Sequence, residues 1–400
     1  MKYIRGKQHL GIEYDWKKIR KAMSKLEIPA DYYNPCSAPL GSAQWFVEMS
    51  ERATGKTTGW LLLGMVMHEL YGTVTVYLRS TADQIAPKNM SSLFDVIIDN
   101  DYIEKITGGK YNNVQYIARK WYYCKTDDGG VIETAPTYFC RMISIDKAGD
   151  LKSSFNEVRG DLILFDEFIP INKRLQRPNE FVELVDVIST VFRLRESGII
   201  VMLANLIDKY NQYFHDLEIF ERISEMQIGD NCTHITDGGT RIYIDFIGTN
   251  SNYRHRKNKW VQLFAGFRKP ELAAITGQST WSIKNYQHIP DTDDVETVNR
   301  DLYIYHNSKY IRLDIVNNPE LGRCMYIHWA TRTTDRSVIL TKSDINDNRF
   351  VYGLGLNTEI YNILMYFFKT GRIYFASNDV GSFFETYLIN CGLTNTKFYI

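Results

Sequence analysis

Residues 50–57, with the sequence SERATGKT, have the composition of a phosphate-binding loop. They fit the pattern G-x-x-x-x-G-K-[ST], with Ser50 at the first glycine position. Gly55 lets the backbone curl close to a pyrophosphate, and the N–H groups that open the following helix face the anion. Lys56 is expected to neutralise β and γ oxygens, and Thr57 to offer its hydroxyl to Mg²⁺. The expected nucleotide-binding residues here are Ser50, Glu51, Arg52, Ala53, Thr54, Gly55, Lys56, Thr57 and Thr58.

A second string, DLILFDE at residues 161–167, has the pattern of a buried strand that ends in two adjacent carboxylates. Asp166 is expected to hold Mg²⁺ through water, and Glu167 to orient and polarise an attacking water. Acids at a strand end are common, but together with the upstream loop they predict a site that hydrolyses a nucleotide. A glutamate directly after the aspartate favours ATP hydrolysis by a motor-type NTPase over a kinase or a switch GTPase.

Two further positions could complete this site. Arg193 and Arg195 end the helix that follows the acidic strand, where an arginine could reach the nucleotide of a neighbouring subunit. The alternative is a solvated arginine pair at a helix end. Asn205, at the tip of the apolar run GIIVMLAN, could sense the γ-phosphate, although asparagine at a strand end is also a common turn residue.

The elements that must position these side chains alternate along the chain between apolar runs and helical patterns. Strands alternating with helices indicate a mainly parallel sheet that is covered on both faces, so the fold class is α/β. A β-hairpin with a turn at 127–130 interrupts the alternation. The expected strands are 45–49, 74–79, 161–166 and 198–204, the hairpin arms are 114–124 and 131–145, and the helices are 57–71, near 91–99, and 179–192.

The second half of the chain has a different pattern. Residues 249–297 are rich in Asn, Thr, Ser and Gly, which is typical of a linker or a small lid. Residues 301–340 contain successive strand-like runs, and helical patterns follow at 361–369 and 381–391. The expected domains are therefore an N-terminal basic helix in 1–30, a P-loop ATPase domain in 31–248, the linker or lid in 249–297, and a smaller α+β domain in 298–400.

The basic helix is predicted from residues 14–26, where apolar side chains recur at helical spacing and lysines and arginines fill the other face. It could dock on the first domain as a surface helix, or it could contact nucleic acid or a protein partner.

Composition excludes several classes of protein. The 400 residues contain 47 Lys plus Arg and 47 Asp plus Glu, so a polycation that coats DNA is not expected. No apolar run approaches the roughly 20 residues that span a bilayer, and the N-terminus lacks a signal-peptide core, so a cytoplasmic protein without a membrane partner is expected. Cysteines and histidines show no metal-site spacing.

The order of the motifs resembles the DNA-packaging ATPases of small podophages with protein-primed, unit-length genomes. The strings that carry the resemblance are YNP (33–35), FVEMSERATGKT (46–57), VYLR (76–79), LFDEFI (164–169), PNE (178–180), TVFRLRE (190–196), AN (204–205) and YF (213–214). FDEFI combined with VFRxRE is the specific part. Ser50 departs from the glycine of the family, and the family pattern does not explain the N-terminal basic helix.

The resemblance implies a terminase-like motor, a pentameric homo-oligomeric ring on the portal of an empty prohead, that threads double-stranded viral DNA inward with ATP and Mg²⁺. It would act in the host cytoplasm, transiently at the portal vertex. Arg193 matches an arginine finger acting in trans, Arg52 the arginine of the phosphate loop, and Tyr33 a position near the adenine. The implied fold is a P-loop NTPase domain of the additional-strand (ASCE) type, a linker or lid, and a smaller RNase-H-like domain.

The expected second domain lacks the pattern of an active nuclease. Its first strand, 302–306, contains no acid, and the acids elsewhere do not define one two-metal cluster from sequence. We therefore expect a nuclease-like fold without nuclease activity. DNA contacts should be phosphate contacts that are independent of base sequence. The candidates, each of which could also be solvated surface, are Arg79, Lys173, Arg174, Arg177, Arg254, Arg256, Lys257 and Lys259.

Two other functions remain open at this point. One is a P-loop DNA-dependent ATPase of the helicase or repair type, which would separate strands and respond to single-stranded DNA. The other is a non-enzymatic interaction protein that keeps a degenerate nucleotide fold, against which the intact residues Lys56, Thr57, Asp166 and Glu167 argue.

Overall fold

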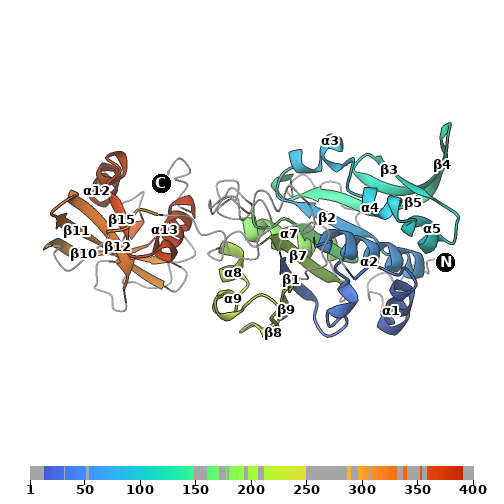
Figure 1. The fold of residues 1–400 in the computed structure, drawn as a ribbon, viewed down its shortest axis with the longest axis horizontal. Coiled ribbons are helices and arrows are strands. Elements are labelled where there is room, and N and C mark those ends of the chain that lie inside the picture. Colours follow the sequence, from blue (N-terminus) through green and yellow to red (C-terminus); the bar gives the residue numbers. More distant parts are fainter. Residues whose placement is uncertain are drawn as a thin grey trace.

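The computed structural model describes residues 13–30, 32–50, 54–147, 160–170, 177, 180–192, 197–205, 211–248, 286–289, 296–306, 309–330, 337–339, 352–353 and 358–390. These residues form a nine-stranded sheet covered by helices and a separate six-stranded sheet towards the C-terminus (Figure 1).

The first sheet has the strand order β3-β4-β5-β2-β6-β7-β1-β9-β8. The run β5-β2-β6-β7-β1-β9 pairs in parallel throughout, and β3, β4 and β8 add antiparallel edges. Strand β7 lies between β1 and β6, so one additional strand separates the strand before the phosphate loop from the acidic strand. The strands are β1 (Trp45–Ser50), β2 (Thr75–Arg79), β3 (Asn113–Ile117), β4 (Lys120–Asp127), β5 (Gly130–Ser144), β6 (Leu162–Asp166), β7 (Ile199–Asn205), β8 (Asn231–Ile235) and β9 (Arg241–Phe246).

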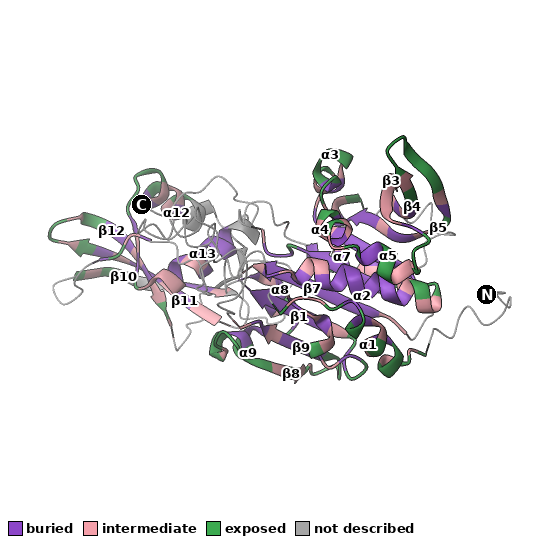
Figure 2. Ribbon diagram, turned by 45° about the vertical axis from the view of Figure 1, so that its right-hand side comes forward, coloured by how far each residue is buried: buried purple, intermediate pink, exposed green. Residues whose placement is uncertain are grey.

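Helices cover both faces of this sheet, as the apolar strands require. Alternate residues of one strand pack into opposite cores. Phe46 packs in the core that contains α2 (Lys56–Tyr71), whereas Val47 packs in the core that contains α7 (Glu180–Phe192). The α2 face also carries α1 (Trp16–Ser24), α4 (Asp95–Asp99) and α5 (Tyr102–Thr107), and the α7 face carries α8 (Gln212–Asp216) and α9 (Phe220–Glu225). Figure 2 shows the buried strands between these two layers.

Helix α2 (Lys56–Tyr71) lies at the centre of the domain, and its sequence explains both its position and its ends. It is apolar on all sides, which is typical of a helix that is buried rather than amphipathic. It begins after Gly55, whose φ of +83° favours glycine, and it ends at Gly72, whose N–H bonds the His68 carbonyl. The expected helix 57–71 is thus confirmed within one residue.

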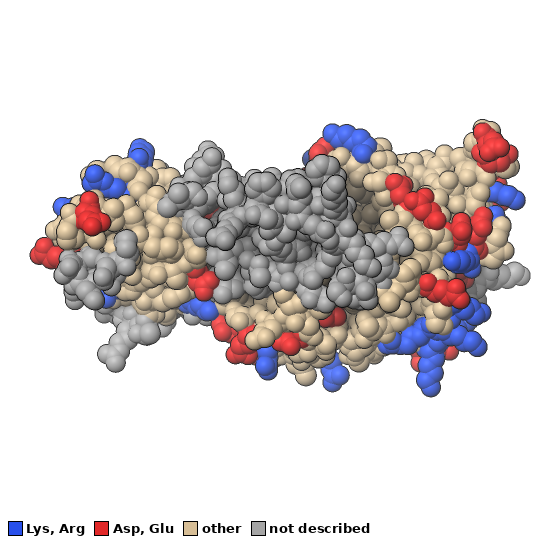
Figure 3. All heavy atoms as spheres, viewed as in Figure 1, with Lys and Arg blue, Asp and Glu red and all other residues tan. Residues whose placement is uncertain are grey.

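Helix α1 docks on the first domain. Its apolar residues Ile19 and Met23 are buried in the α2 core, and Arg20 donates hydrogen bonds to the carbonyl oxygens of Cys36 and Ala38. Asp15 caps the helix by accepting from the first backbone N–H groups. Lysines remain on the outer face, where Figure 3 shows a concentration of Lys and Arg near α1. The docked alternative is observed, and a nucleic-acid contact by the outer face stays a prediction.

The middle of the first domain differs from the expected pattern in two ways. The expected hairpin is a three-stranded unit, because Ala118 and Arg119 both adopt positive φ and join β3 to β4 in a tight turn. The expected helix near 91–99 is confirmed only in its second half, as α4, and a separate short helix, α3 (Pro87–Met90), precedes it. Strands β8 and β9, at the far edge of the sheet, are not anticipated from the sequence.

The second sheet has the order β14-β13-β10-β11-β12-β15. Strands β10, β11 and β12 form an antiparallel meander, and β13 pairs in parallel with β10. The segment 286–289 lies against this unit, because the Tyr286 hydroxyl donates to Glu385 and His288 bridges to Phe375. The elements are β10 (Glu296–His306), β11 (Lys309–Asn318), β12 (Gly322–Trp329), β13 (Ser337–Ile339), β14 (Tyr352–Gly353), α12 (Thr358–Lys369), β15 (Ile373–Phe375) and α13 (Asn378–Asn390).

Lys309, at the start of β11 in the second sheet, contacts helix α9, which packs on the first sheet. Its ammonium lies 4.2 Å from the ring centroid of Phe220 in α9 and 3.5 Å from Glu221 Oε1. The boundaries expected at 248 and 297 lie in or next to residues 249–285 and 290–295, which are outside the described residues. Among the described helices, none is long and apolar enough to cross a membrane.

Candidate active site

The carboxyl ends of β1, β6 and β7 bring the predicted chemistry to one edge of the first sheet. Ser50 is opposite Asn205 in the β1–β7 register, and Asp166 is opposite Leu203 in the β6–β7 register. Ligands of open α/β sheets bind at this edge. The strand order therefore places residues that are over 100 positions apart in the chain around one site.

The backbone of the loop turns at Gly55, directly before helix α2. A Cβ atom added at Gly55 would lie 2.6 Å from the Tyr32 ring, so both the backbone angle and the close approach require glycine. Lys56 Nζ donates a hydrogen bond to Ser50 Oγ, which also lies 2.8 Å from Thr54 Oγ1. Ser50 thus uses its hydroxyl to fix the lysine and the loop, a contact that glycine at the same position could not make.

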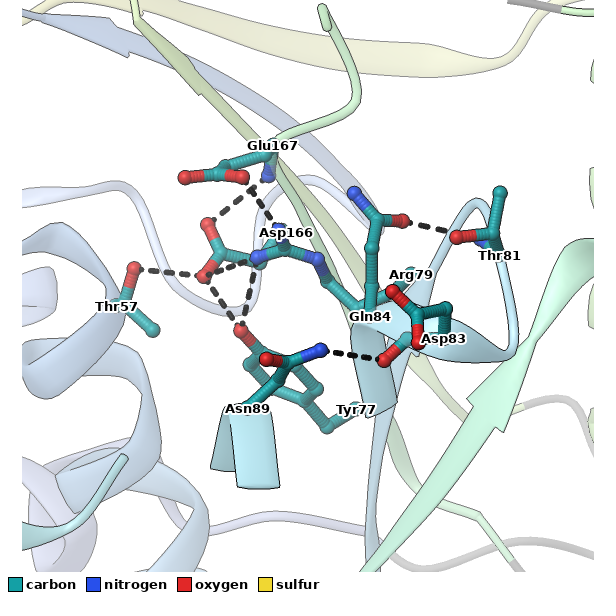
Figure 4. A network of polar contacts seen from close by, with 9 residues as sticks. All are labelled: Thr57, Tyr77, Arg79, Thr81, Asp83, Gln84, Asn89, Asp166 and Glu167. Carbon is teal, nitrogen blue, oxygen red and sulfur yellow. Dashed lines mark hydrogen bonds and ion pairs between the residues drawn. The ribbon is translucent and has the colours of Figure 1, made fainter. Parts of the chain in front are cut away.

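Thr57 and Asp166 form the part of the site that could hold a metal. The Thr57 hydroxyl donates to Asp166 Oδ2 over 3.0 Å, and the buried Tyr77 hydroxyl donates to the same oxygen over 2.7 Å (Figure 4). Burial, followed by the charge of Asp166, raises the pKa of Tyr77 well above its ordinary value, so its proton stays in place. Hydroxyl and carboxylate oxygens are the ligands that Mg²⁺ prefers, so this pair fits that ion.

Arg79, at the end of β2, contacts both acids. Its Nη1 lies 3.7 Å from Asp166 Oδ2, and its Nη2 donates a hydrogen bond to Glu167 Oε2. Burial by itself lowers the pKa of Arg79, but the neighbouring Tyr77, Asp166 and Glu167 raise it overall. The Arg79 side chain is 12% exposed, so Arg79 is an internal cation of the site rather than a surface charge. Figure 4 shows the Arg79 guanidinium facing both carboxylates, with a dashed line to each.

Glu167 has an unusual backbone conformation that sets the direction of its side chain. Its φ is +54°, its N–H donates to Asp166 Oδ1 over 3.0 Å, and the next N–H, of Phe168, donates to Leu203 O. A left-handed backbone conformation is uncommon at a residue other than glycine, and it persists only where the surrounding structure holds it. The turn separates the two carboxylates, so that Asp166 faces Thr57 while Glu167 is half exposed at the rim.

An open cavity of about 410 Å³ lies between these groups. This volume is within the range of ligand-binding pockets. The loop supplies one wall, and the acids and the end of β7 supply the other. Its lining residues are Thr54, Gly55, Lys56, Thr57, Thr58, Asp166, Glu167, Ala204 and Asn205.

Most of the predicted nucleotide residues that the structure describes line this cavity, and Tyr33 lies apart from it. The Tyr33 hydroxyl donates to Glu48 in the interior over 2.6 Å, and its ring borders a separate small cavity with Tyr32 and Thr58. The role of Tyr33 near an adenine stays a prediction. Outside the described residues lie Glu51, Arg52, Ala53, Arg193 and Arg195.

Two members of the site were not assigned to it from the sequence. The sequence pattern makes Tyr77 an apolar strand residue, and it predicts Arg79 only as a possible DNA contact. The signal that could have found them is their register: both lie on β2, which pairs with β6 next to Asp166. Because alternate residues share a face, Tyr77 and Arg79 must point to the same side.

Of the other expected DNA contacts, only Arg177 is described. It lies 2.6 Å from Glu183 and 3.5 Å from Glu180 at the start of α7, so its charge is compensated locally. The remaining candidates, Lys173, Arg174, Arg254, Arg256, Lys257 and Lys259, lie outside the described residues.

Comparison with solved structures identifies the fold. The chain superposes on "The Phi-28 gp11 DNA packaging Motor" with a TM-score of 0.54 and 16% identity, covering 91% of this chain and 98% of that chain. It superposes on "The bacteriophage Phi-29 viral genome packaging motor assembly" with a TM-score of 0.54 and 19% identity, covering 90% and 100% of the two chains. No protein-family model and no curated protein matches the sequence. The expected resemblance to phage packaging motors is thus confirmed at the level of the fold.

Proposed function

We propose that the protein is an ATPase that moves double-stranded viral DNA into a preformed capsid through the portal, as a pentameric ring of identical subunits. The observation that carries this proposal is the single cavity lined by Lys56, Thr57, Asp166 and Glu167. These four groups are the ones that ATP hydrolysis requires, and the fold similarity to two phage packaging motors indicates what the hydrolysis would drive.

The loop and α2 supply the binding part of the reaction. Lys56 and the N–H groups at the start of α2 provide positive potential for the phosphates of ATP. Thr57 and Asp166 would hold Mg²⁺, which when bound neutralises phosphate oxygens. Tyr77 keeps Asp166 oriented toward Thr57 through its own hydrogen bond.

Glu167 supplies the acid–base part. Its Oε2 accepts a hydrogen bond from Arg79, and the residue lines the cavity. A residue that orients the attacking water needs one free carboxylate oxygen, so Glu167 can keep its contact with Arg79 while Oε1 orients the water. We infer that Arg79, which also lies beside Asp166, holds Glu167 in position for this role.

The second domain is proposed to be RNase-H-like and without nuclease activity. Support for the fold comes from the meander β10-β11-β12 and from β13, which adds in parallel beside β10. Asp314 supports inactivity, because Arg312 Nε and His328 Nε2 occupy its two oxygens at 2.8 and 3.0 Å. Among the described residues, no group of three or more His, Cys, Asp or Glu side chains could hold a metal ion.

Steady-state ATP hydrolysis tests the proposal. We expect long double-stranded DNA to stimulate hydrolysis by the wild-type protein, and Glu167→Gln to bind nucleotide but lose about 10²–10⁴ in turnover. Stimulation by single-stranded DNA alone would favour the helicase alternative. Equal turnover in Glu167→Gln and wild type would contradict the assigned role of Glu167.

A further inference from the structure

A carboxyl group is buried beneath the phosphate loop. Glu48 lies on β1, two residues before Ser50, and it is 0% exposed. Its side chain points to the α2 face of the sheet, among the apolar residues of that core. A carboxyl group in such surroundings is costly unless its oxygens have hydrogen-bond partners.

Both oxygens have a partner, and the partners come from different elements. The Tyr33 hydroxyl donates to Oε1 over 2.6 Å, and the Trp60 indole N–H donates to Oε2 over 2.7 Å. Glu48 therefore ties the strand that leads into the loop to the helix that leaves it. It also ties both to residues 32–37, which we call the strap.

The strap in turn holds the loop itself. The Tyr33 N–H donates to Thr54 O over 2.8 Å, immediately before Gly55. The strap also crosses α2 closely: a Cβ atom at Gly59 would lie 2.5 Å from Tyr33 O. Through Tyr33, one buried carboxyl group is thus linked to the loop backbone at Thr54.

We propose that Glu48 is a positioning residue for the phosphate-binding loop, and that nucleotide binding is coupled to the protonation of its carboxyl group. This inference rests on the proposed nucleotide-binding function and adds a regulation of the same site. Glu48 does not line the cavity, so it acts through Tyr33, Trp60 and Lys56.

The groups around Glu48 set its titration. The pKa of Glu48 is raised overall to about 8. Burial is the largest cause and raises it, the hydrogen bonds from Tyr33 and Trp60 lower it, the charge of Asp245 raises it, and the charge of Lys56 lowers it. Asp245 is opposite Glu48 on β9, and burial raises its own pKa to about 6. Tyr243, beside Asp245, has its pKa raised by burial, so it remains protonated.

Nucleotide binding should therefore take up a proton. The phosphates would bring negative charge to Lys56, which reduces the help that Lys56 gives to an ionised Glu48. The pKa of Glu48 then rises further in the complex. With a pKa of about 8, Glu48 is partly ionised in the free protein near pH 8, so binding should take up a fraction of a proton, up to about one half.

Calorimetric titration of the full chain with Mg-ADP, in buffers of different ionisation enthalpy over roughly pH 7–9.5, measures affinity and proton uptake together. We expect the affinity of the wild type to fall by up to about tenfold per pH unit above pH 8, while Glu48→Gln stays flat and takes up no proton. Tyr33→Phe, which removes only a hydroxyl, should weaken binding severalfold. The matched control Glu69→Gln, on an exposed residue near the other end of α2, should follow the wild type.

Three results would be adverse. Identical pH profiles for the wild type and Glu48→Gln would overturn the proton coupling, and unchanged affinity in Tyr33→Phe would overturn the positioning role. Wild-type affinity in Lys56→Ala would instead contradict nucleotide binding in this cavity, and the inference would fall with it.

Discussion

Replacing Arg79 with methionine should destabilise the protein, because the buried Asp166 carboxylate would lose its cationic partner. The relevant distance is 3.7 Å between Arg79 Nη1 and Asp166 Oδ2, at which a dielectric constant of about 20 gives an attraction of about 4 kcal/mol. Glu167 adds little, because its side chain is 48% exposed. Removing one partner of a buried pair costs about 3–5 kcal/mol, and we expect a loss near 3 kcal/mol because Tyr77 and Thr57 still bond Asp166.

The assay is urea or thermal unfolding of four proteins that form a double-mutant cycle: wild type, Arg79→Met, Asp166→Asn and the double variant. A loss near 3 kcal/mol corresponds to roughly 6–12 °C in Tm. We expect Arg79→Met to cost at least about 2 kcal/mol less in the Asp166→Asn background. Arg241→Met, on an exposed strand residue, is the matched control and should change little. An equal cost of Arg79→Met in both backgrounds would refute the pairing as the source of the loss.

Three further perturbations follow from the structure. Thr57→Val should weaken nucleotide affinity about tenfold in the presence of Mg²⁺, which nucleotide titration with and without Mg²⁺ would show. Equal affinities of the variant and the wild type with Mg²⁺ would exclude Thr57 from the metal site. Glu180→Ala should cost about 3 kcal/mol in urea unfolding, because its buried carboxylate accepts from Ser80 and Tyr213, whereas the more exposed Glu183→Ala should cost far less. Plasmid DNA should survive incubation with the wild type and Mg²⁺ or Mn²⁺; cutting that Asp314→Ala abolishes would contradict the inactive second domain.

Local sequence patterns predict the geometry of the loop, of α2 and of the acidic strand end well. The loop turns at Gly55, α2 begins within one residue of its expected start, and Asp166 ends a buried strand. Each of these features depends on short-range chemistry: a glycine at positive φ, an apolar helix, and an apolar strand that ends in acids. Their convergence follows from the parallel sheet, which the alternation of strands and helices predicts.

The groups that hold the site in place depend on contacts between distant segments. From sequence alone, an arginine at a strand end, such as Arg79, fits an exposed position as well as a buried one until the neighbouring strand is known. Glu48 likewise looks like the polar position of a half-exposed strand, although Tyr33 and Trp60 make it a buried junction. Strands β8 and β9 are not predicted from the sequence, because β8 is short and polar-rich and β9 becomes part of the sheet only through its pairing with β1.

Movement along intact double-stranded DNA is the central claim, and displacement of a third strand from a DNA triplex tests it most directly. The wild-type protein with ATP should release the third strand while the underlying duplex stays paired, and Glu167→Gln should release none. ATP hydrolysis accompanied by separation of the duplex strands, or by no release of the third strand, would contradict the account.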